Sequence, residues 1–363
     1  MQAPVNLPQK SYRFQNGVRI VSGYGASIRV DRGHLLIRDT GMAGAGELRL
    51  ERIGHGLRRL VVISPDWYIT GAALEWLTHQ DASLVVLERD GEVFCATGRR
   101  GSSDARLKRV QAALPEPEAL SIAKRIIDAK LEGQERNLRE LLRNDDRAAL
   151  IAGLRLAVYR RADSLSRVRT LESIGAKHYW QSFRDLPVAF NKPDTGKVPD
   201  HWQTWGSRYS PLSGFSPRLA ITPAHAIVNY VFAVLEAEAV IACHKMGLDP
   251  TLGILHNDWQ QRPSLALDIM EPVRPSVDRW VFEFLANTPL EKRLLWERPD
   301  GNCRLMAELC ATLAQTAPLW EKGVSYWVEW ITQELWKVSG RHGRKPAARL
   351  TQNARRERFK KNG

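Results

Sequence analysis

The chain has 363 residues, which is enough for two domains that each bury a core of their own. Its hydrophobic content of 44% and charged content of 26% are those of a soluble globular protein, so a chain embedded in a membrane is not expected. The formal net charge of +13 is unusual, and it predicts a polyanionic partner, either nucleic acid or an anionic membrane surface.

The membrane alternative has little support in the sequence. The most apolar long run, residues 221–243, is interrupted by four polar or charged residues, so it predicts a buried helix rather than a membrane span. These residues are His225, Asn229, Glu236 and Glu238. The N-terminal stretch "MQAPVNLPQKSYRF" lacks the apolar core of a signal peptide. The four cysteines form no CxxC pair, which favours reduced thiols and a cytoplasmic protein.

The sequence pattern of the first hundred residues predicts mostly strands. "SIRVDRGHLLIR" alternates, turns at Asp31-Arg32-Gly33 and resumes, and "GELRLERI" alternates again. "LRRLVVIS" predicts a buried strand, and "SLVVLERDGEVFCATG" predicts a hairpin that turns at Asp90-Gly91. One short helix is expected from about Thr70 to His79. Residues 1–98 are therefore predicted to form a small β-rich domain.

After a linker rich in Gly, Ser and charge, predicted at 99–117, the pattern becomes helical. In "EALSIAKRIIDAKLEGQERNLRELLR" the apolar residues recur at helical intervals, with basic residues between them. Further helices are expected near 147–160, 163–185, 222–246, 264–287, 303–316 and 320–338, with a long loop at 187–220. The fold class is thus α+β with two domains, and the larger domain, 118–338, is predicted to be all-α.

The tail at 339–363 is strongly basic. From Lys337 onwards the chain holds ten Lys or Arg residues and one acid, Glu357. One interpretation is a flexible, solubilising tail, and the other is an electrostatic arm that contacts phosphates.

Two acids stand in an apolar segment. Asp268 and Glu271 are three residues apart, which puts them on one face of a helix, about 4.5 Å apart along its axis. Two buried carboxylates repel each other unless one is protonated or a cation lies between them. His256 precedes this helix and is a third possible ligand. Pro272 and Pro275 are expected to break the helix and fix the direction of Glu271.

The same two acids could instead belong to a buried salt-bridge network with Arg262 and Arg274. A third acid, Glu172, favours the cation site, because it also lies among apolar residues. Gly175 and Ala176 on the same helix let another helix approach closely, so Glu172 is expected to face the interior.

Three motifs in order, "LESIGAKHYW", "GLDPTLGILH" and "SLALDIMEPVRPSVD", resemble those of the CRISPR-associated protein one family. The resemblance covers most of residues 15–340. That family is the catalytic subunit of the integrase that inserts new spacers into CRISPR arrays. The resemblance implies that Glu172, His256 and Glu271 are metal ligands and that Asp268 is a supporting acid of the catalytic site.

The resemblance also implies residues that contact DNA or line the site. Asn229 and Tyr230 match an Asn-Tyr pair that precedes the histidine, and Arg262 and Arg274 match basic positions beside the acids. Lys130 is one of several basic residues on the first long helix that could contact DNA, although interleaved acids there also fit a solvated face. The chain departs from the family at Thr222-Pro223-Ala224-His225 and at Val273.

Two carboxylates and one imidazole suit Mg²⁺ or Mn²⁺. The expected reaction is metal-dependent transesterification, in which the 3′-OH end of a short DNA fragment attacks a phosphate in CRISPR repeat DNA. The resemblance further implies a homodimer joined through the β-rich domain, and a small CRISPR-associated adaptation subunit as partner. Alternatives are a transposon-encoded integrase of the same fold, a branched-DNA nuclease in repair, and a non-catalytic DNA-binding scaffold.

Overall fold

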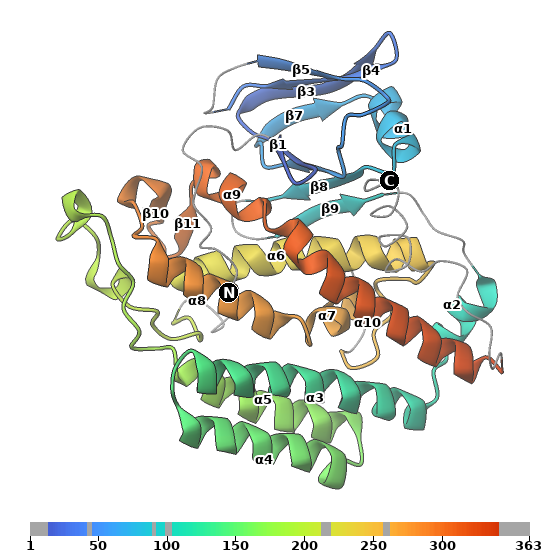
Figure 1. The fold of residues 1–363 in the computed structure, drawn as a ribbon, viewed down its shortest axis with the longest axis vertical. Helices are drawn as coiled ribbons and strands as arrows, with labels where there is room; N and C mark the ends of the chain where they lie inside the picture. Colours follow the sequence, from blue (N-terminus) through green and yellow to red (C-terminus); the bar gives the residue numbers. More distant parts are fainter. Residues whose placement is uncertain are drawn as a thin grey trace, which may run out of the picture. The chain divides into compact units, whose positions relative to one another are not determined.

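The computed structural model describes residues 14–41, 46–88, 92–98, 104–211, 219–256 and 262–340 (Figure 1). The chain divides into two compact units. Unit 1 comprises Met1–Arg99, Phe183–Ala237 and Trp280–Pro318, and unit 2 comprises Arg100–Ser182, Glu238–Arg279 and Leu319–Gly363. The predicted β-rich segment, 1–98, falls within unit 1, where two later segments join it. The predicted domain boundaries themselves stay a prediction.

The N-terminal part of unit 1 contains two sheets and one helix. The five-stranded sheet has the order β1 (Phe14–Gln15), β2 (Val18–Val21), β6 (Arg59–Val62), β8 (Ser83–Leu87), β9 (Val93–Thr97). The four-stranded sheet has the order β5 (Gly46–Leu50), β4 (His34–Asp39), β3 (Tyr24–Asp31), β7 (Asp66–Ile69). Helix α1 (Gly71–His79) follows β7. The prediction of a β-rich N-terminal region is therefore confirmed.

Local turns in this region follow the sequence closely. Strands β3 and β4 pair in antiparallel fashion around Arg32 and Gly33, whose φ angles of 47° and 83° form the predicted tight turn. Strands β8 and β9 also pair as the predicted hairpin, although its turn lies outside the described residues. The parallel pairings of β2 with β6, β6 with β8 and β3 with β7 have no local sequence signal, because they join distant segments.

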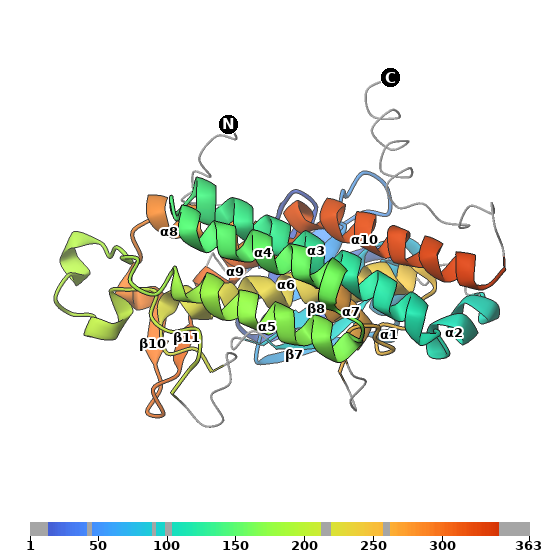
Figure 2. The ribbon, with the colours of Figure 1, turned by 90° about the horizontal axis from the view of Figure 1, so that it is seen from below.

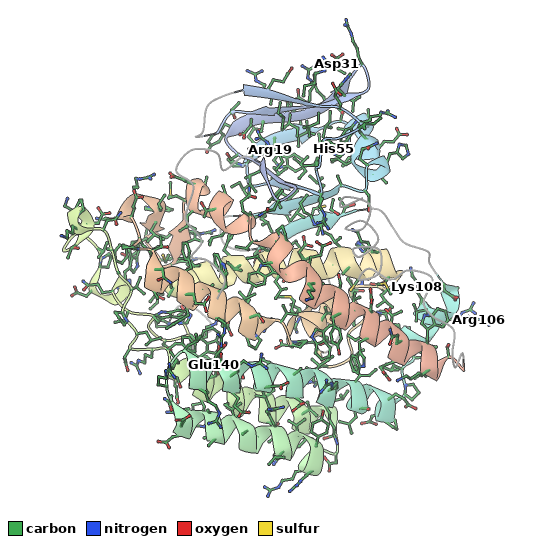
Figure 3. All side chains as sticks on the ribbon, viewed as in Figure 1. Arg19, Asp31, His55, Arg106, Lys108 and Glu140 are labelled. Carbon is green, nitrogen blue, oxygen red and sulfur yellow. The ribbon has the colours of Figure 1, made fainter. Side chains whose placement is uncertain are left out.

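Apolar side chains of both sheets and α1 form one core. Ile28, Leu60 and Trp76 are among its fully or almost fully buried members. One charged pair is buried in the same region, where Arg19 Nη2 lies 3.4 Å from Asp39 Oδ2. Figure 3 labels Arg19 and also His55, whose ring packs against Trp76 with 5.0 Å between centroids.

The later part of unit 1 combines helices with long irregular segments and a hairpin. It holds the 3₁₀ helices η1 (Lys192–Asp194), η2 (Asp200–Trp202) and η4 (Lys292–Leu294), a hairpin of β10 (Leu295–Glu297) and β11 (Cys303–Leu305), and α9 (Ala307–Ala314). The hairpin corrects one prediction, because residues 303–305 form a strand rather than the start of a helix. Apart from it, the region after 118 is mostly helical, as the predicted fold class requires. Trp202 and Trp205, which the sequence places in a long loop, are buried.

Three long helices have one end in each unit. They are α6 (Pro223–Met246), α8 (Arg274–Asn287) and α10 (Ala317–Val338). Helix α6 is long and apolar enough to cross a membrane, but 78% of its most apolar window is buried in the protein, as expected of a core helix.

Unit 2 is built on helices. α3 (Glu116–Glu140), α4 (Asp145–Arg161) and α5 (Leu165–Gln181) run side by side in both ribbon views (Figures 1 and 2). A Cβ atom at Gly175 of α5 would lie 2.7 Å from Leu131 Cδ2 of α3, so the predicted close helix approach is confirmed. Helix α2 (Ala105–Ala112) occupies part of the segment predicted as a linker, and α7 (Ser264–Met270) completes the unit.

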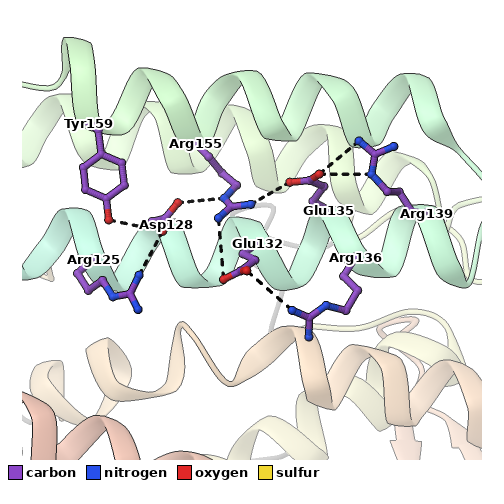
Figure 4. A network of polar contacts seen from close by, with 8 residues as sticks. All are labelled: Arg125, Asp128, Glu132, Glu135, Arg136, Arg139, Arg155 and Tyr159. Atoms are coloured by element: carbon purple, nitrogen blue, oxygen red, sulfur yellow. Dashed lines mark hydrogen bonds and ion pairs between the residues drawn. The ribbon is translucent and has the colours of Figure 1, made fainter.

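A network of ion pairs joins α3 to α4 (Figure 4). Arg155 of α4 places Nε 3.0 Å from Asp128 Oδ1 and Nη1 3.1 Å from Glu135 Oε2 on α3. Arg125, Arg136 and Arg139 of α3 pair with the same acids or with Glu132. The basic residues that the sequence offers for DNA contact are thus partly neutralised by acids of their own helix.

Candidate active site

The four predicted catalytic residues all lie in unit 2. Glu172 is on α5, His256 is in the segment between α6 and α7, Asp268 is on α7, and Glu271 follows α7 directly. All seven residues of α7 are buried, as the apolar sequence around the acids predicts. The site is therefore assembled from three segments that are far apart in the sequence.

Prolines separate α7 from α8 next to Glu271. Helix α7 ends at Met270 and α8 begins at Arg274, so the single helix predicted for 264–287 is interrupted where Pro272 stands. The α7–α8 turn rests closely on α3, because a Cβ atom at Gly133 would lie 2.7 Å from Pro275 Cβ. The helix break that the prolines predict is thus confirmed, and the direction of Glu271 stays a prediction.

The Asp268 carboxylate is fully buried and holds the segment that carries His256. Its Oδ2 accepts the backbone N–H groups of Ile254 at 2.6 Å and Leu255 at 3.0 Å. Its Oδ1 accepts the backbone N–H of His256 at 3.1 Å and lies 2.5 Å from Nδ1 of the same histidine. Both oxygens are therefore committed to the His256 segment, and Asp268 orients the imidazole.

Two further side chains hold this segment. Arg169 of α5 donates from Nε to the Leu255 carbonyl oxygen at 2.7 Å. Gln111 of α2 donates to the carbonyl oxygens of Asp249 at 2.7 Å and Leu252 at 3.1 Å. Side chains of α2, α5 and α7 thereby all hold the segment that leads to His256.

Glu271 lies at the centre of the charged groups. Its Oε1 is 2.9 Å from Arg274 Nη1 and 3.8 Å from His256 Nε2, and its Oε2 is 2.6 Å from Lys130 Nζ. Burial favours the neutral acid, but Arg274, Lys130 and His256 outweigh burial and lower the pKa of Glu271 from 4.5 to about 2. Glu271 is therefore ionised across the physiological pH range.

Lys130 is placed differently from the sequence prediction. Its side chain is only 7% exposed, and its ammonium group contacts the carboxylates of both Glu172 and Glu271. Burial opposes the charged amine, but the two carboxylates raise the pKa of Lys130 above its ordinary value. In this structure Lys130 is thus a buried cation of the acidic site rather than a surface contact for DNA.

The residues fit a hard divalent cation in part. Within the described ranges, no three His, Cys, Asp or Glu side chains stand together as a formed metal site. Glu271 Oε2 is nevertheless buried and faces a cation already, the Lys130 ammonium at 2.6 Å. An oxygen in that position, beside a second carboxylate and an imidazole nitrogen, is the donor chemistry that Mg²⁺ and Mn²⁺ accept.

The other residues predicted to contact DNA or line the site belong to both units. Arg274 pairs with Glu271, whereas no ion pair joins Arg262 to Asp268 or Glu271. Asn229 and Tyr230 lie in unit 1, where Asn229 Oδ1 accepts from Arg208 Nη1 at 2.7 Å and Tyr230 is almost fully buried. Their contribution to the site stays a prediction.

Comparison with known proteins identifies the family. The family model described as "CRISPR associated protein Cas1" matches residues 20–317. The chain belongs to the Cas1 family. The family resemblance predicted from the three sequence motifs is thereby confirmed, and the chain is an enzyme of the Cas1 endonuclease/integrase family of CRISPR adaptation.

Relatives in the Cas1 family match most of the chain. The CRISPR-associated endonuclease Cas1 1 of Archaeoglobus fulgidus is 27% identical over 320 residues, which cover 81% of this chain and 87% of the relative. The CRISPR-associated endonuclease Cas1 2 of Rhodospirillum rubrum is 27% identical over 303 residues, which cover 79% of this chain and 81% of the relative.

Solved structures share the Cas1 fold at low sequence identity. A casposase bound to integration product aligns with a TM-score of 0.72 and 19% identity, covering 90% of this chain and 92% of that one. A Cas1 protein from Thermotoga maritima aligns with a TM-score of 0.64 and 16% identity, covering 88% of this chain and 96% of that one.

Sequence reasoning misses several residues of this Cas1 site. Gln111, Asn137 and Arg169 hold the segments next to His256 and Glu271, yet each is a polar residue within a helix and resembles a surface position. Only the structure shows that Gln111 and Asn137 lie in the interior, where both are less than 5% exposed.

Proposed function

We propose that this protein joins the 3′-OH ends of short DNA fragments to CRISPR repeat DNA by metal-dependent transesterification. The observation that carries the proposal is the convergence of Glu172 and Glu271 on one point, the Lys130 ammonium, with His256 Nε2 3.8 Å from Glu271. Glu172, His256 and Glu271 would hold Mg²⁺ or Mn²⁺. The bound ion would act as a Lewis acid toward the phosphate oxygens of the DNA.

The chain's own residues prepare the site for this chemistry. Asp268 occupies Nδ1 of His256, which leaves Nε2 on the side of Glu271 for a ligand or a proton. Because the Glu271 pKa is about 2, its carboxylate needs no deprotonation before it binds a cation at neutral pH. Arg274 and Lys130 keep this buried charge stable until then.

The substrate and partners follow from charge and from structural likeness. A net charge of +13 favours DNA as the polyanion. The proposed assembly is a homodimer with a small adaptation subunit, and two similar solved structures, each a Cas6-RT-Cas1–Cas2 complex, support that partner. The casposase likeness shows a shared fold and does not favour a transposon role, whereas the matched relatives are CRISPR-associated endonucleases.

The test combines a short duplex, a supercoiled plasmid that bears CRISPR repeats, and the full-length protein. We expect joining with Mn²⁺ or Mg²⁺ and no joining with chelator. Because joining should require a 3′-OH, a fragment with 3′-dideoxy ends should not be joined. A repair nuclease would instead cut branched DNA equally well with either kind of fragment end. Sequencing of the junctions shows whether insertion occurs at the repeats.

Isosteric variants test which residues are needed for the joining reaction. Glu172→Gln and Glu271→Gln are expected to abolish joining while leaving DNA binding close to that of the unmodified protein. Glu132→Gln is the matched control, because Glu132 is a half-exposed acid on the outer face of α3. Undiminished joining by Glu271→Gln would refute the assigned site, and joining that survives chelation would refute metal dependence.

A further inference from the structure

Lys130 lies where a cation shared by Glu172 and Glu271 would be. Its ammonium contacts one oxygen of each carboxylate, and its side chain is 7% exposed. A buried ammonium without partners is very costly, so the two acids are its electrostatic complement. Neither acid makes an equivalent contact with a second lysine within the described part of the chain.

The geometry points to Lys130 as a built-in counter-ion that competes with the divalent metal for Glu172 and Glu271 and is displaced when the metal binds. This inference rests on the proposed function, since it assigns a regulatory residue to the same site. A divalent ion that took the two oxygens contacted by Lys130 would repel the buried ammonium strongly at that distance. Metal binding through these oxygens therefore displaces the ammonium, whereas Arg274 contacts the other oxygen of Glu271.

The supporting contacts indicate that Lys130, rather than Glu271, is the group that moves. Asn137 Nδ2 donates to the Pro275 carbonyl at 2.7 Å, and Gly133 lets Pro275 rest directly against α3. These contacts lock the turn that carries Glu271, and Arg274 holds its carboxylate at 2.9 Å. Lys130, by contrast, carries its charge on a flexible four-carbon chain.

Glu172 provides a direction for this movement. Its side chain is 23% exposed, whereas those of Lys130 and Glu271 are 7% and 3% exposed. An ammonium that leaves Glu271 can therefore move past Glu172 toward solvent without crossing the core. The internal cation would also stabilise the site before metal is present and prevent repulsion between the two acids.

The first experiment measures Mn²⁺ affinity by calorimetry on full-length, DNA-free protein. Lys130→Met removes the charge at similar length and is expected to bind Mn²⁺ at least about tenfold more tightly than the unmodified protein. Lys130→Arg keeps a cation and should show no such gain, and Lys124→Met, on a more exposed part of α3, is the matched control. Unchanged or weaker Mn²⁺ binding by Lys130→Met would overturn the inference.

A second measurement needs no variant and guards against a Lys130→Met protein that fails to fold. Acetylation of each lysine by acetic anhydride is followed by mass spectrometry with and without Mn²⁺. Lys130 should become several-fold more reactive with metal, while exposed Lys322 should not change. Constant or reduced Lys130 reactivity, together with measurable Mn²⁺ binding, would refute the displacement of Lys130 but not the proposed metal-dependent function. Absence of Mn²⁺ binding by the unmodified protein would instead refute the proposed metal-dependent function.

Discussion

Asp268 is fully buried and contacts the partly exposed His256 twice: its carboxylate lies 2.5 Å from the imidazole Nδ1 and also accepts the backbone N–H of the same histidine. This double contact fixes both the ring and the chain that carries it. Both oxygens of Asp268 are engaged by the His256 segment, which fits the supporting role predicted for this acid. Carboxylate–histidine pairs of this kind orient metal-binding imidazoles.

Replacing Asp268 with Asn should therefore damage the site indirectly. The amide keeps one acceptor oxygen for the four donors that Asp268 Oδ1 and Oδ2 now serve. We expect the free energy of unfolding to fall by about 1–3 kcal/mol and joining to fall by about 10–100-fold. Urea denaturation and the joining assay measure the two effects. Exposed Asp185→Asn is the control, and full joining by Asp268→Asn would exclude the orienting role.

How far the sequence predicts this site depends on the range of each interaction. The i, i+3 spacing of Asp268 and Glu271 and the break at Pro272 are local, so the buried acids and the end of α7 are predictable. The place of Glu172 beside Glu271 comes from the family motifs, because helical periodicity cannot show which distant helices meet. Lys130 escapes prediction for the same reason, since a lysine on an amphipathic helix resembles any surface lysine.

The fold shows the same limit. The β3–β4 hairpin follows from residues within one turn, whereas the parallel β2–β6 and β6–β8 pairings are set by the packing of distant strands. Helix α2 lies in a segment whose Gly, Ser and charge indicate a linker, yet Gln111 of α2 supports the His256 loop. Tertiary contacts outweigh local composition there.

Asn137 should be important for the position of Glu271. Its Nδ2 donates to the Pro275 carbonyl at 2.7 Å and to Tyr179 Oη at 2.9 Å inside the protein. Asn137→Ala leaves both acceptors buried, so we expect the free energy of unfolding to fall by about 2–4 kcal/mol. Joining should also fall, because the turn that carries Glu271 is released.

The control for this variant is Asn287→Ala, which removes an exposed hydrogen bond to the Glu283 carbonyl at the end of α8. That change should cost well under about 1 kcal/mol. Thermal unfolding and the Mn²⁺ dependence of joining are measured for both proteins. Equal stability of the two variants, or an unchanged Mn²⁺ dependence in Asn137→Ala, would argue against a positioning role.

Arg155 tests whether the α3–α4 network stabilises the helices without affecting the site. It is 27% exposed and lies within ion-pair distance of Asp128, Glu132 and Glu135 (Figure 4). Arg155→Met leaves three acids of α3 without their shared cation. After allowance for solvent screening, we expect a loss of about 1 kcal/mol of unfolding free energy that shrinks at high salt, with joining unchanged.

A double-mutant cycle with Asp128→Asn separates the pair from the rest of the network. The coupling energy should be about 0.5–1 kcal/mol, because Asp128 is mostly buried and lies 3.0 Å from Arg155 Nε. Additive effects of the two changes would show that this pair contributes no interaction energy. A large loss of joining by Arg155→Met would show that the network reaches the site.

His225 should make the stability of the protein depend on acid pH. The ring is almost fully buried at the start of α6, with Nε2 3.2 Å from the Gly206 carbonyl oxygen and its plane at 86° to that of Trp205. Burial and the nearby Arg208 guanidinium lower the pKa of His225 from 6.5 to about 3, although the Gly206 carbonyl acts in the opposite direction.

Because the folded pKa is depressed, the unfolded chain takes up a proton as pH falls below about 6.5, and the folded chain does so only near pH 3. The contribution of His225 to stability is therefore complete above pH 6.5 and decreases between pH 6.5 and 3, by up to about 1.4 kcal/mol per pH unit. His225→Gln can still donate to Gly206. It should reduce the number of protons taken up on unfolding in this pH range by about one, so the free energy of unfolding should fall less steeply with decreasing pH. Urea unfolding at several pH values in this window measures the slope, with exposed His79→Gln as control. Equal slopes in His225→Gln and the unmodified protein would show that His225 is already protonated in the folded state.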